Sequence, residues 1–229
     1  MLDSDHPGPS AGPDHRSWAR LRWALLVVLV MALVLGTMAL RWSRDAAAGT
    51  STSSPSADLY VPAIYPAAAA PALDLTDQQG RPFTLAQLRN RVVLISFGYT
   101  HCPDVCPTTL AIDRQVVDAV GDGVAVVFVT IDPERDTADA LRTYLDAFQR
   151  PFIGLTGSAD QIRDVARAWN VVYIKGAVEA SGAYPMVHTA GTFIVDPQGR
   201  LRLFFDYGTP ASVLADAVRG LAPGSTPTP

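Results

Sequence analysis

The chain has 229 residues, with 22 acidic and 18 basic side chains and a formal net charge of −4. From Ala72 onward there are 13 basic and 17 acidic residues, so this part carries the negative charge and offers no basic stripe. These features exclude a nucleic-acid-binding function, and the length allows one or two domains.

The first part of the chain, residues 1–17, contains prolines and glycines and shows no apolar periodicity. We expect a short disordered tail in the cytoplasm, in which His6 and His15 are solvated. The segment that follows is different, because Trp23 to Leu40 contains no charged residue. Its length is close to the minimum for a helix that spans a bilayer.

Arginines stand on both sides of this apolar segment, with a slight excess before it: Arg16, Arg20 and Arg22 precede it, and Arg41 and Arg44 follow. This asymmetry places the N-terminus in the cytoplasm. We therefore predict that residues 18–42 form a single transmembrane anchor. The membrane would be the cytoplasmic (inner) membrane of a bacterium. The functional domain would then lie on the periplasmic side.

Two other interpretations of this segment are weaker. A cleaved signal peptide is suggested by the small residues Ala46, Ala47 and Ala48, but the apolar run is long and arginines separate it from them. An organelle transit peptide would avoid acidic residues, yet three aspartates lie before residue 15. After the anchor, residues 43–71 are rich in Ala, Ser, Thr and Pro, which predicts a linker.

The folded domain is predicted over residues 72–222, with a disordered C-terminus at 223–229. Residues 92–97 are apolar on both faces, which predicts a central strand covered on both sides. A loop with both cysteines follows, then a helix over about 108–120 that Gly121 ends. Residues 124–131 predict a second buried strand.

The rest of the domain alternates between helices and strands. Asp136 or Thr137 caps the next helix, and Ser158 with Gln161 forms a capping box for another. Short strands are expected near 83–85, near 153–155 and over 171–174, and a loop or open hairpin over 176–185. Two further strands, 192–195 and 201–205, are joined by the turn Asp196-Pro197-Gln198-Gly199, and a last helix starts at Thr209-Pro210.

This order is that of the thioredoxin-like fold, an α/β fold with a central sheet and flanking helices, here preceded by a transmembrane helix. The loop after the first core strand is where this fold places its active site. Residues 155–170 fit an extra helical insertion.

That loop lies in GYTHCPDVCP, residues 98–107, which holds the only two cysteines, Cys102 and Cys106. On a helical turn their spacing puts both sulfurs on one face, and a helix N-terminus favours thiolate over thiol. A disulfide between them would close almost no loop and would stabilise the fold little. A functional pair is therefore favoured over a structural disulfide.

Two thiolates suit Cu(I), Zn(II) or disulfide exchange, and a metal site needs a third donor. The domain has two histidines. His101 is expected to project away from the cysteines and to position the loop or tune a thiol. His188 precedes the strand that lies beside the cysteine loop in this fold, where oxidoreductases carry a cis-proline and this chain has none. Its imidazole can complete an S₂N set, or it is an ordinary loop histidine.

In three blocks the chain resembles the Sco family, also called SenC: GYTHCPDVCP at 98–107, VTIDPERDT at 129–137, and the His188 segment that ends in VDPQGRL. The resemblance covers residues 72–221. It implies that Cys102, Cys106 and His188 bind copper, as Cu(I) or Cu(II). It also implies a metallochaperone, rather than an enzyme, that delivers copper to the dinuclear copper site of cytochrome c oxidase.

The partners implied are the copper-centre subunit of the oxidase, a thioredoxin-like reductant that keeps the thiols reduced, and an upstream copper chaperone. The alternative is a thiol-disulfide oxidoreductase that uses Cys102 and Cys106 to reduce the cysteines of the oxidase copper site, and the two roles can coexist. A peroxidase-like enzyme is less favoured, because the reactive-cysteine context of that class is absent.

One position departs from the family pattern. Many members carry an aspartate immediately before the ligand histidine, where this chain has Val187, and a carboxylate there could orient the ring. The lipid-attachment cysteine of some bacterial relatives is also absent, which favours an uncleaved anchor. We expect Asp132 to be structural and Asp104 to shape the loop, and neither to be a ligand.

Overall fold

The computed structural model describes residues 25–26, 29–38 and 63–222. The chain divides into two units, Met1–Ser54 and Pro55–Pro229. In the first unit, residues 29–38 are helical. No helix within the described ranges is both long and apolar enough to cross a membrane. Most of the predicted tail, anchor and linker lies outside these ranges, so the anchor stays a prediction.

The second unit is built on an eight-stranded mixed sheet. In spatial order its strands are β1 (Ala63–Ala69), β10 (Arg200–Asp206), β9 (Gly191–Val195), β4 (Val92–Gly98), β5 (Val124–Thr130), β6 (Ile153–Thr156), β2 (Leu75–Asp77) and β3 (Pro82–Phe83). β4, β5 and β6 are parallel, whereas β9 and β10 run antiparallel to their neighbours.

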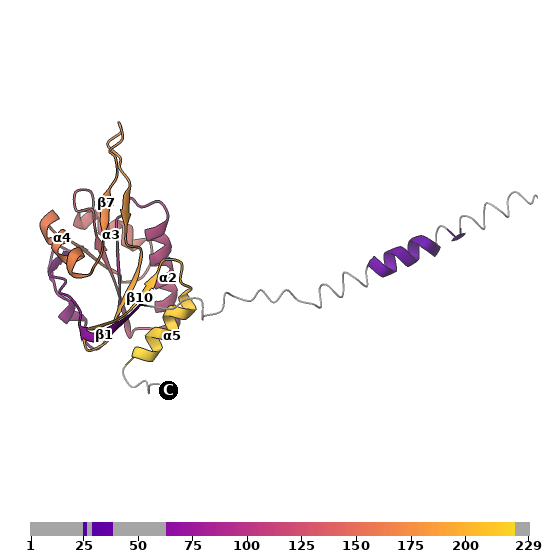
Figure 1. The fold of residues 1–229 in the computed structure, drawn as a ribbon, viewed down its shortest axis with the longest axis horizontal. Coiled ribbons are helices and arrows are strands. Elements are labelled where there is room, and N and C mark those ends of the chain that lie inside the picture. Colours follow the sequence, from indigo (N-terminus) through magenta and orange to yellow (C-terminus); the bar gives the residue numbers. More distant parts are fainter. Residues whose placement is uncertain (1–24, 27–28, 39–62, 223–229) are drawn as a thin grey trace, which may run out of the picture. The chain divides into compact units, whose positions relative to one another are not determined.

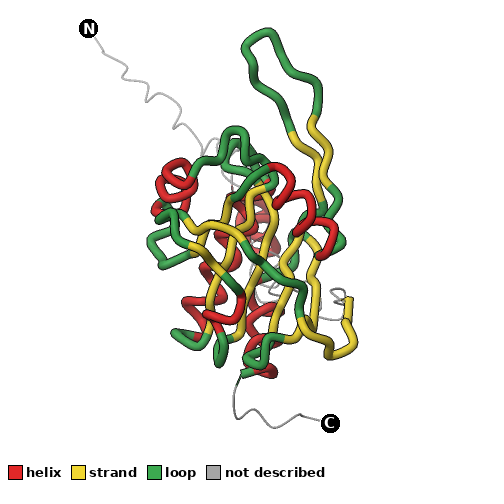
Figure 2. The backbone as a smooth tube through the Cα atoms, turned by 90° about the vertical axis from the view of Figure 1, so that its left-hand side faces the viewer, coloured by secondary structure: helices red, strands yellow, loops and turns green. Residues whose placement is uncertain are grey.

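Four α-helices and a short 3₁₀ helix accompany this sheet: η2 (Leu85–Leu88), α2 (Val105–Val120), α3 (Ala138–Asp146), α4 (Ala159–Ala168) and α5 (Ala211–Leu221). In Figure 1, α2 and α5 lie on one side of the sheet and α4 on the other. A second sheet pairs β7 (Tyr173–Lys175) with β8 (Met186–His188), and Figure 2 shows this hairpin extending beyond the body of the domain. The predicted α/β, thioredoxin-like arrangement is confirmed.

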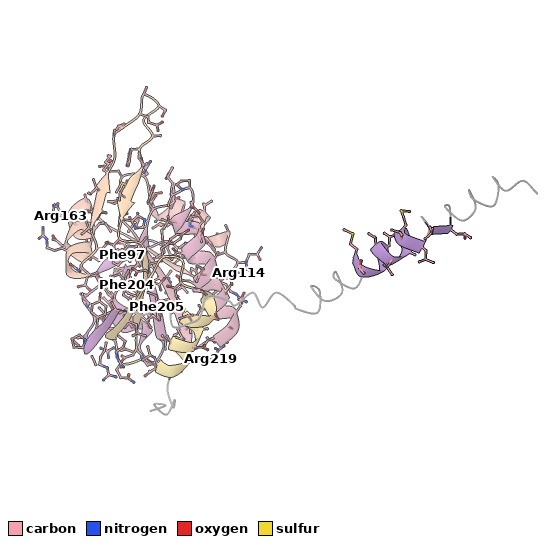
Figure 3. All side chains as sticks on the ribbon, turned by 45° about the vertical axis from the view of Figure 1, so that its right-hand side comes forward. Phe97, Arg114, Arg163, Phe204, Phe205 and Arg219 are labelled. Carbon is pink, nitrogen blue, oxygen red and sulfur yellow. The ribbon has the colours of Figure 1, made fainter. Side chains whose placement is uncertain are left out.

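The core lies around the central strands. Every residue of β4, β5 and β9 is buried, as the continuous apolar runs predict for strands covered on both faces. Aromatic rings fill the space beside β9. The centroid of the Phe193 ring lies 5.3 Å from the centroid of the Trp169 ring and 4.5 Å from that of the Phe204 ring. In Figure 3, Phe97 and Phe204 lie inside the domain, whereas Arg114 projects from its surface.

Several sequence predictions of local structure are confirmed. Ser158 and Gln161 form the reciprocal capping box at the start of α4. Gly121 is the C-cap of α2 and has a φ of 89°, a conformation that favours glycine. The turn between β9 and β10 is closed by a hydrogen bond from the Gly199 amide to the Asp196 carbonyl.

One helix boundary differs from the prediction, and the choice between two predicted caps is decided. α2 begins at Val105, not near residue 108, so Cys106 lies in its first turn. Pro107 does not prevent this, because amides in the first turn have no partner within the helix. The side chain that caps α3 belongs to Thr137, which accepts a bond from the Ala140 amide, and not to Asp136.

The strand β1 was not expected, and it overlaps the linker predicted over 43–71. Its sequence, AIYPAAA, has few residues that favour strands, and Pro66 lacks an amide for the ladder. β1 nevertheless pairs with β10 at the edge of the sheet, where only one side needs backbone donors. The strand expected over 171–174 is β7 at 173–175, and residues 85–88 form η2.

One buried acid gives the fold a testable pH dependence. Asp113 on α2 is fully buried, and its Oδ1 accepts a 3.3 Å bond from Thr192 on β9. Its Oδ2 has no partner among the described residues. Burial raises the pKa of Asp113 from 3.8 to about 7.

We predict that the free energy of unfolding falls as the pH rises from about 4 to about 7. In this window the carboxyl group of Asp113 loses its proton in the unfolded state and keeps it in the folded state. The free energy of unfolding therefore falls by up to about 1.4 kcal/mol for each pH unit. The Asp113→Asn variant should lack this slope. Urea denaturation at several pH values measures it, with the exposed Asp122→Asn as control. Parallel pH profiles for wild type and Asp113→Asn would contradict the prediction.

Candidate metal centre

The two sequence blocks at 98–107 and 129–137 meet at one end of the sheet. β4 and β5 are parallel, and Gly98 at the end of β4 pairs with Thr130 at the end of β5. The loop after β4 carries the cysteines, and the loop after β5 carries Asp132 and Asp136. Ligand sites of open α/β sheets commonly form at such carboxyl ends.

Asp136 joins these two loops. Its buried carboxylate accepts bonds from the Thr100 amide at 3.0 Å, the Thr100 hydroxyl at 2.6 Å and the Thr130 hydroxyl at 2.6 Å. The first two bonds hold the loop two residues before Cys102. The sequence predicted Asp136 only as a possible helix cap. Its position within the 129–137 block was the one sequence signal that it could connect the two loops.

The structure brings Cys102, Cys106 and His188 together. The Cys106 sulfur lies 3.6 Å from Nε2 of His188, and the Cys106 amide donates to the Cys102 sulfur at 3.4 Å. The three potential ligand atoms all lie within 4.8 Å of one another. Both cysteines are free thiols. This arrangement can hold one metal ion between two sulfurs and one nitrogen.

Gly98 provides the space for the buried sulfur. Cys106 is only 3% exposed and packs against the end of β4. A Cβ atom on Gly98 would lie 2.7 Å from the Cys106 sulfur and 2.7 Å from the Phe128 ring. Real Cβ contacts are essentially never that short, so any larger residue at 98 must displace the thiol or the ring.

His188 is oriented for metal binding by its second nitrogen. Nδ1 lies 2.8 Å from the Thr189 carbonyl oxygen, which can only accept, so Nδ1 carries the proton. The lone pair of Nε2 then faces the sulfurs. The ring also meets Tyr99 edge to face, with the centroids 6.3 Å apart. Burial lowers the pKa of His188, which keeps the imidazole neutral as a ligand must be.

The thiol of Cys106 differs from the sequence expectation. Burial raises its pKa, so the metal-free protein holds Cys106 as a thiol, although the helix N-terminus was expected to favour thiolate. The helix dipole contributes about 1 kcal/mol or less at most sites, and desolvation of a buried sulfur outweighs it. A bound metal ion replaces this proton, because the ligand is the thiolate.

The other candidates lie outside this group. The His101 side chain is 54% exposed, its Nδ1 lies 3.0 Å from the Thr100 hydroxyl and 3.7 Å from the Asp136 carboxylate, and it is not part of the ligand group found among the described residues. Asp104 precedes α2 and accepts a 3.3 Å bond from the Thr108 hydroxyl. Asp132 is buried and bonds to Arg135 and Tyr184, which agrees with a structural role.

Val187 is 69% exposed, because neighbouring residues of a strand point to opposite faces and His188 takes the face towards the sulfurs. A side chain at 187 therefore lies on the surface of the hairpin. An aspartate in this position would not face the ring of His188 directly.

Comparison with known proteins identifies relatives of the whole domain. The SCO1/SenC family model matches residues 63–223. ScoI of Bradyrhizobium japonicum, solved with copper bound, is 36% identical with a TM-score of 0.62, over 67% of this chain and 99% of that chain. Copper-bound ScoI of Arabidopsis thaliana is 32% identical with the same TM-score, over 66% and 96%.

Among sequence relatives, the mitochondrial SCO2 homolog of Bos taurus is 36% identical over 150 residues. That match covers 63% of this chain and 56% of the bovine protein, so the chain spans little more than half of that relative's length.

We predict that Gly98→Ala destabilises the domain by about 1–3 kcal/mol, because the added methyl group overpacks the space of the Cys106 sulfur. The displaced thiol should also react faster with a thiol reagent. Urea denaturation and reaction kinetics measure the two effects. Gly123→Ala is the matched control, since its Cβ would meet nothing within 4 Å. Equal stability and thiol reactivity in both variants would refute the close contact at Gly98.

Proposed function

We propose that this chain, which belongs to the SCO1/SenC family, binds one copper ion through Cys102, Cys106 and His188 and delivers it to the dinuclear copper site of cytochrome c oxidase. The observation that carries the proposal is the convergence of two sulfurs and one imidazole nitrogen within 4.8 Å. Two family members of similar fold, the ScoI proteins of B. japonicum and A. thaliana, have been solved with copper bound.

The chemistry of the donors supports copper as cargo. Thiolate sulfur suits Cu(I), and imidazole nitrogen suits copper in either oxidation state. Cys106 is buried, whereas Cys102 and His188 are only partly buried, so an incoming ligand can approach from their exposed side. A three-donor site at the end of the sheet can therefore hold the ion and release it to a recipient thiolate.

The cellular setting of the proposal rests on the N-terminal segment. Residues 18–42 would anchor the protein in the cytoplasmic membrane of a bacterium, with the copper domain in the periplasm. Donor and recipient subunit would then diffuse in one plane. Copper binding requires both thiols in reduced form, so a thioredoxin-like reductant is a necessary partner, with an upstream chaperone as copper source.

A second function, reduction of the oxidase cysteines, uses the same thiols. It is favoured by one observation, the approach of the Cys106 amide to within 3.4 Å of the Cys102 sulfur, which keeps the two cysteines near each other. The position of His188 beside Cys106 favours the metal site, because disulfide exchange does not need an imidazole ligand there.

We predict that His188→Ala weakens copper binding at least about 10-fold while the domain stays folded. Loss of an outer partner of a ligating histidine already changes metal affinity by about 10–100-fold, so loss of the ligand itself should reach that range. Anaerobic copper titration of the reduced protein measures this, with His101→Ala as the matched control. Unchanged affinity in His188→Ala would remove the S₂N site.

We also predict that Cys102→Ser or Cys106→Ser abolishes oxidase assembly in cells, because each removes one sulfur of the site. The measurement is cytochrome c oxidase activity of isolated membranes, with Ala111→Ser on the same helix as control. Rescue by added copper supports delivery, whereas rescue by a thiol reductant supports the oxidoreductase function. Normal oxidase activity in either cysteine strain would contradict both functions.

A further inference from the structure

His188 lies on a small β-hairpin, β7-β8, that is not part of the main sheet. β7 and β8 have three residues each and, among the strands that the structure describes, pair only with one another. The connection between them spans residues 176–185, and Figures 1 and 2 show the hairpin projecting from the domain. A two-stranded hairpin alone is marginally stable in water. Other contacts must therefore set the distance from the His188 ring to the sulfurs.

One contact between the hairpin and the domain is made by the aromatic ring of Tyr184. The guanidinium carbon of Arg135 lies 3.5 Å from the ring centroid, and the Lys175 nitrogen lies 4.0 Å from it. Arg135 belongs to the loop after β5 and Lys175 to β7. Tyr184 is 8% exposed, and cation–π contacts of desolvated rings are the stronger ones. The ring therefore connects β7 and the segment immediately before β8 to that loop.

The hydroxyl of Tyr184 adds directional bonds. It donates to Asp132 at 2.7 Å, and Asp132 in turn accepts from Nε of Arg135 at 2.5 Å. Glu134 accepts from Lys175 at 2.6 Å. We name Tyr184, Arg135, Lys175, Asp132 and Glu134 the tyrosine clamp. Because the same loop continues to Asp136, the clamp is tied to the loop that carries the cysteines.

A second attachment lies between Tyr184 and His188. The Met186 amide donates to the hydroxyl of Tyr99 at 3.3 Å, and Tyr99 follows β4 three residues before Cys102. Arg135 also lies over the Tyr99 ring, at 5.6 Å. Residues 184 and 186 are thus both fixed, and His188 is the next residue on the same face of the strand.

We propose that Tyr184 is a positioning residue that holds Nε2 of His188 opposite the Cys106 sulfur and so sets the contribution of the histidine to copper binding. The proposal rests on the proposed function. It predicts that loss of the clamp separates the imidazole from the sulfurs and leaves the two cysteines in place, because they belong to α2 and its preceding loop.

The test compares Tyr184→Ala and Tyr184→Phe in the full-length protein in detergent. The first variant removes the ring and the hydroxyl, and the second keeps the ring between the two cations. Cu(II) affinity is measured by titration, and the imidazole ligand is detected by its nitrogen coupling in pulsed electron paramagnetic resonance. We expect Tyr184→Ala to lose the coupling and to bind copper about 10-fold more weakly. Tyr184→Phe should keep the coupling.

A double variant separates positioning from a general loss of stability. If Tyr184 acts through His188, Tyr184→Ala combined with His188→Ala binds copper as His188→Ala does alone. The matched control is Tyr65→Ala, which removes a tyrosine from β1 that packs on Phe193. Additive losses in the double variant, or a retained nitrogen coupling in Tyr184→Ala, would overturn the proposal.

A copper-free measurement keeps this test separate from the proposed function. In the reduced apoprotein, nuclear Overhauser effects between the Tyr99 and His188 rings report their edge-to-face contact. These signals should vanish in Tyr184→Ala and persist in Tyr184→Phe. If wild type binds no copper, the proposed function fails, and the ring contact alone decides whether Tyr184 positions His188. If wild type binds copper and the ring contact survives in Tyr184→Ala, only the positioning role fails.

Discussion

The site depends on one buried carboxylate, that of Asp136, and its bonds to Thr100 and Thr130. A buried carboxylate without partners is costly, so the loops after β4 and β5 must adopt the conformations that satisfy it. The first of these loops leads into the cysteine pair, and the second carries Asp132 and Arg135 of the tyrosine clamp. One polar junction thus orients the groups that surround the sulfurs and those that hold the histidine.

The potential ligands differ in burial and in the element that carries them. Cys106 is buried in the first turn of α2, in a space that exists because residue 98 has no side chain. His188 lies on a hairpin outside the main sheet, attached through Tyr184 and Tyr99. One buried sulfur and one ligand on a hairpin outside the main sheet agree with the proposed binding and delivery of a copper ion.

Much of the fold could be predicted from residue patterns alone. Continuous apolar runs predicted β4 and β5, Ser158 with Gln161 predicted the start of α4, and Gly121 predicted the end of α2. β1 could not be predicted, because its alanine-rich sequence becomes a strand only through pairing with β10. The early start of α2 was also missed, since Pro107 in the first helical turn resembles a helix boundary in the sequence.

The sequence by itself determined which residues could form the site: the only two cysteines, their spacing, and a histidine before the hairpin strand. Residue types and intervals carry that information, because sulfur and imidazole chemistry is local. Tertiary structure alone decided that Cys106 is a buried thiol, that Val187 faces away from the sulfurs and that Tyr184 joins the hairpin to the domain. Burial and contacts between segments about 50 residues apart depend on how the chain packs, which no local pattern encodes.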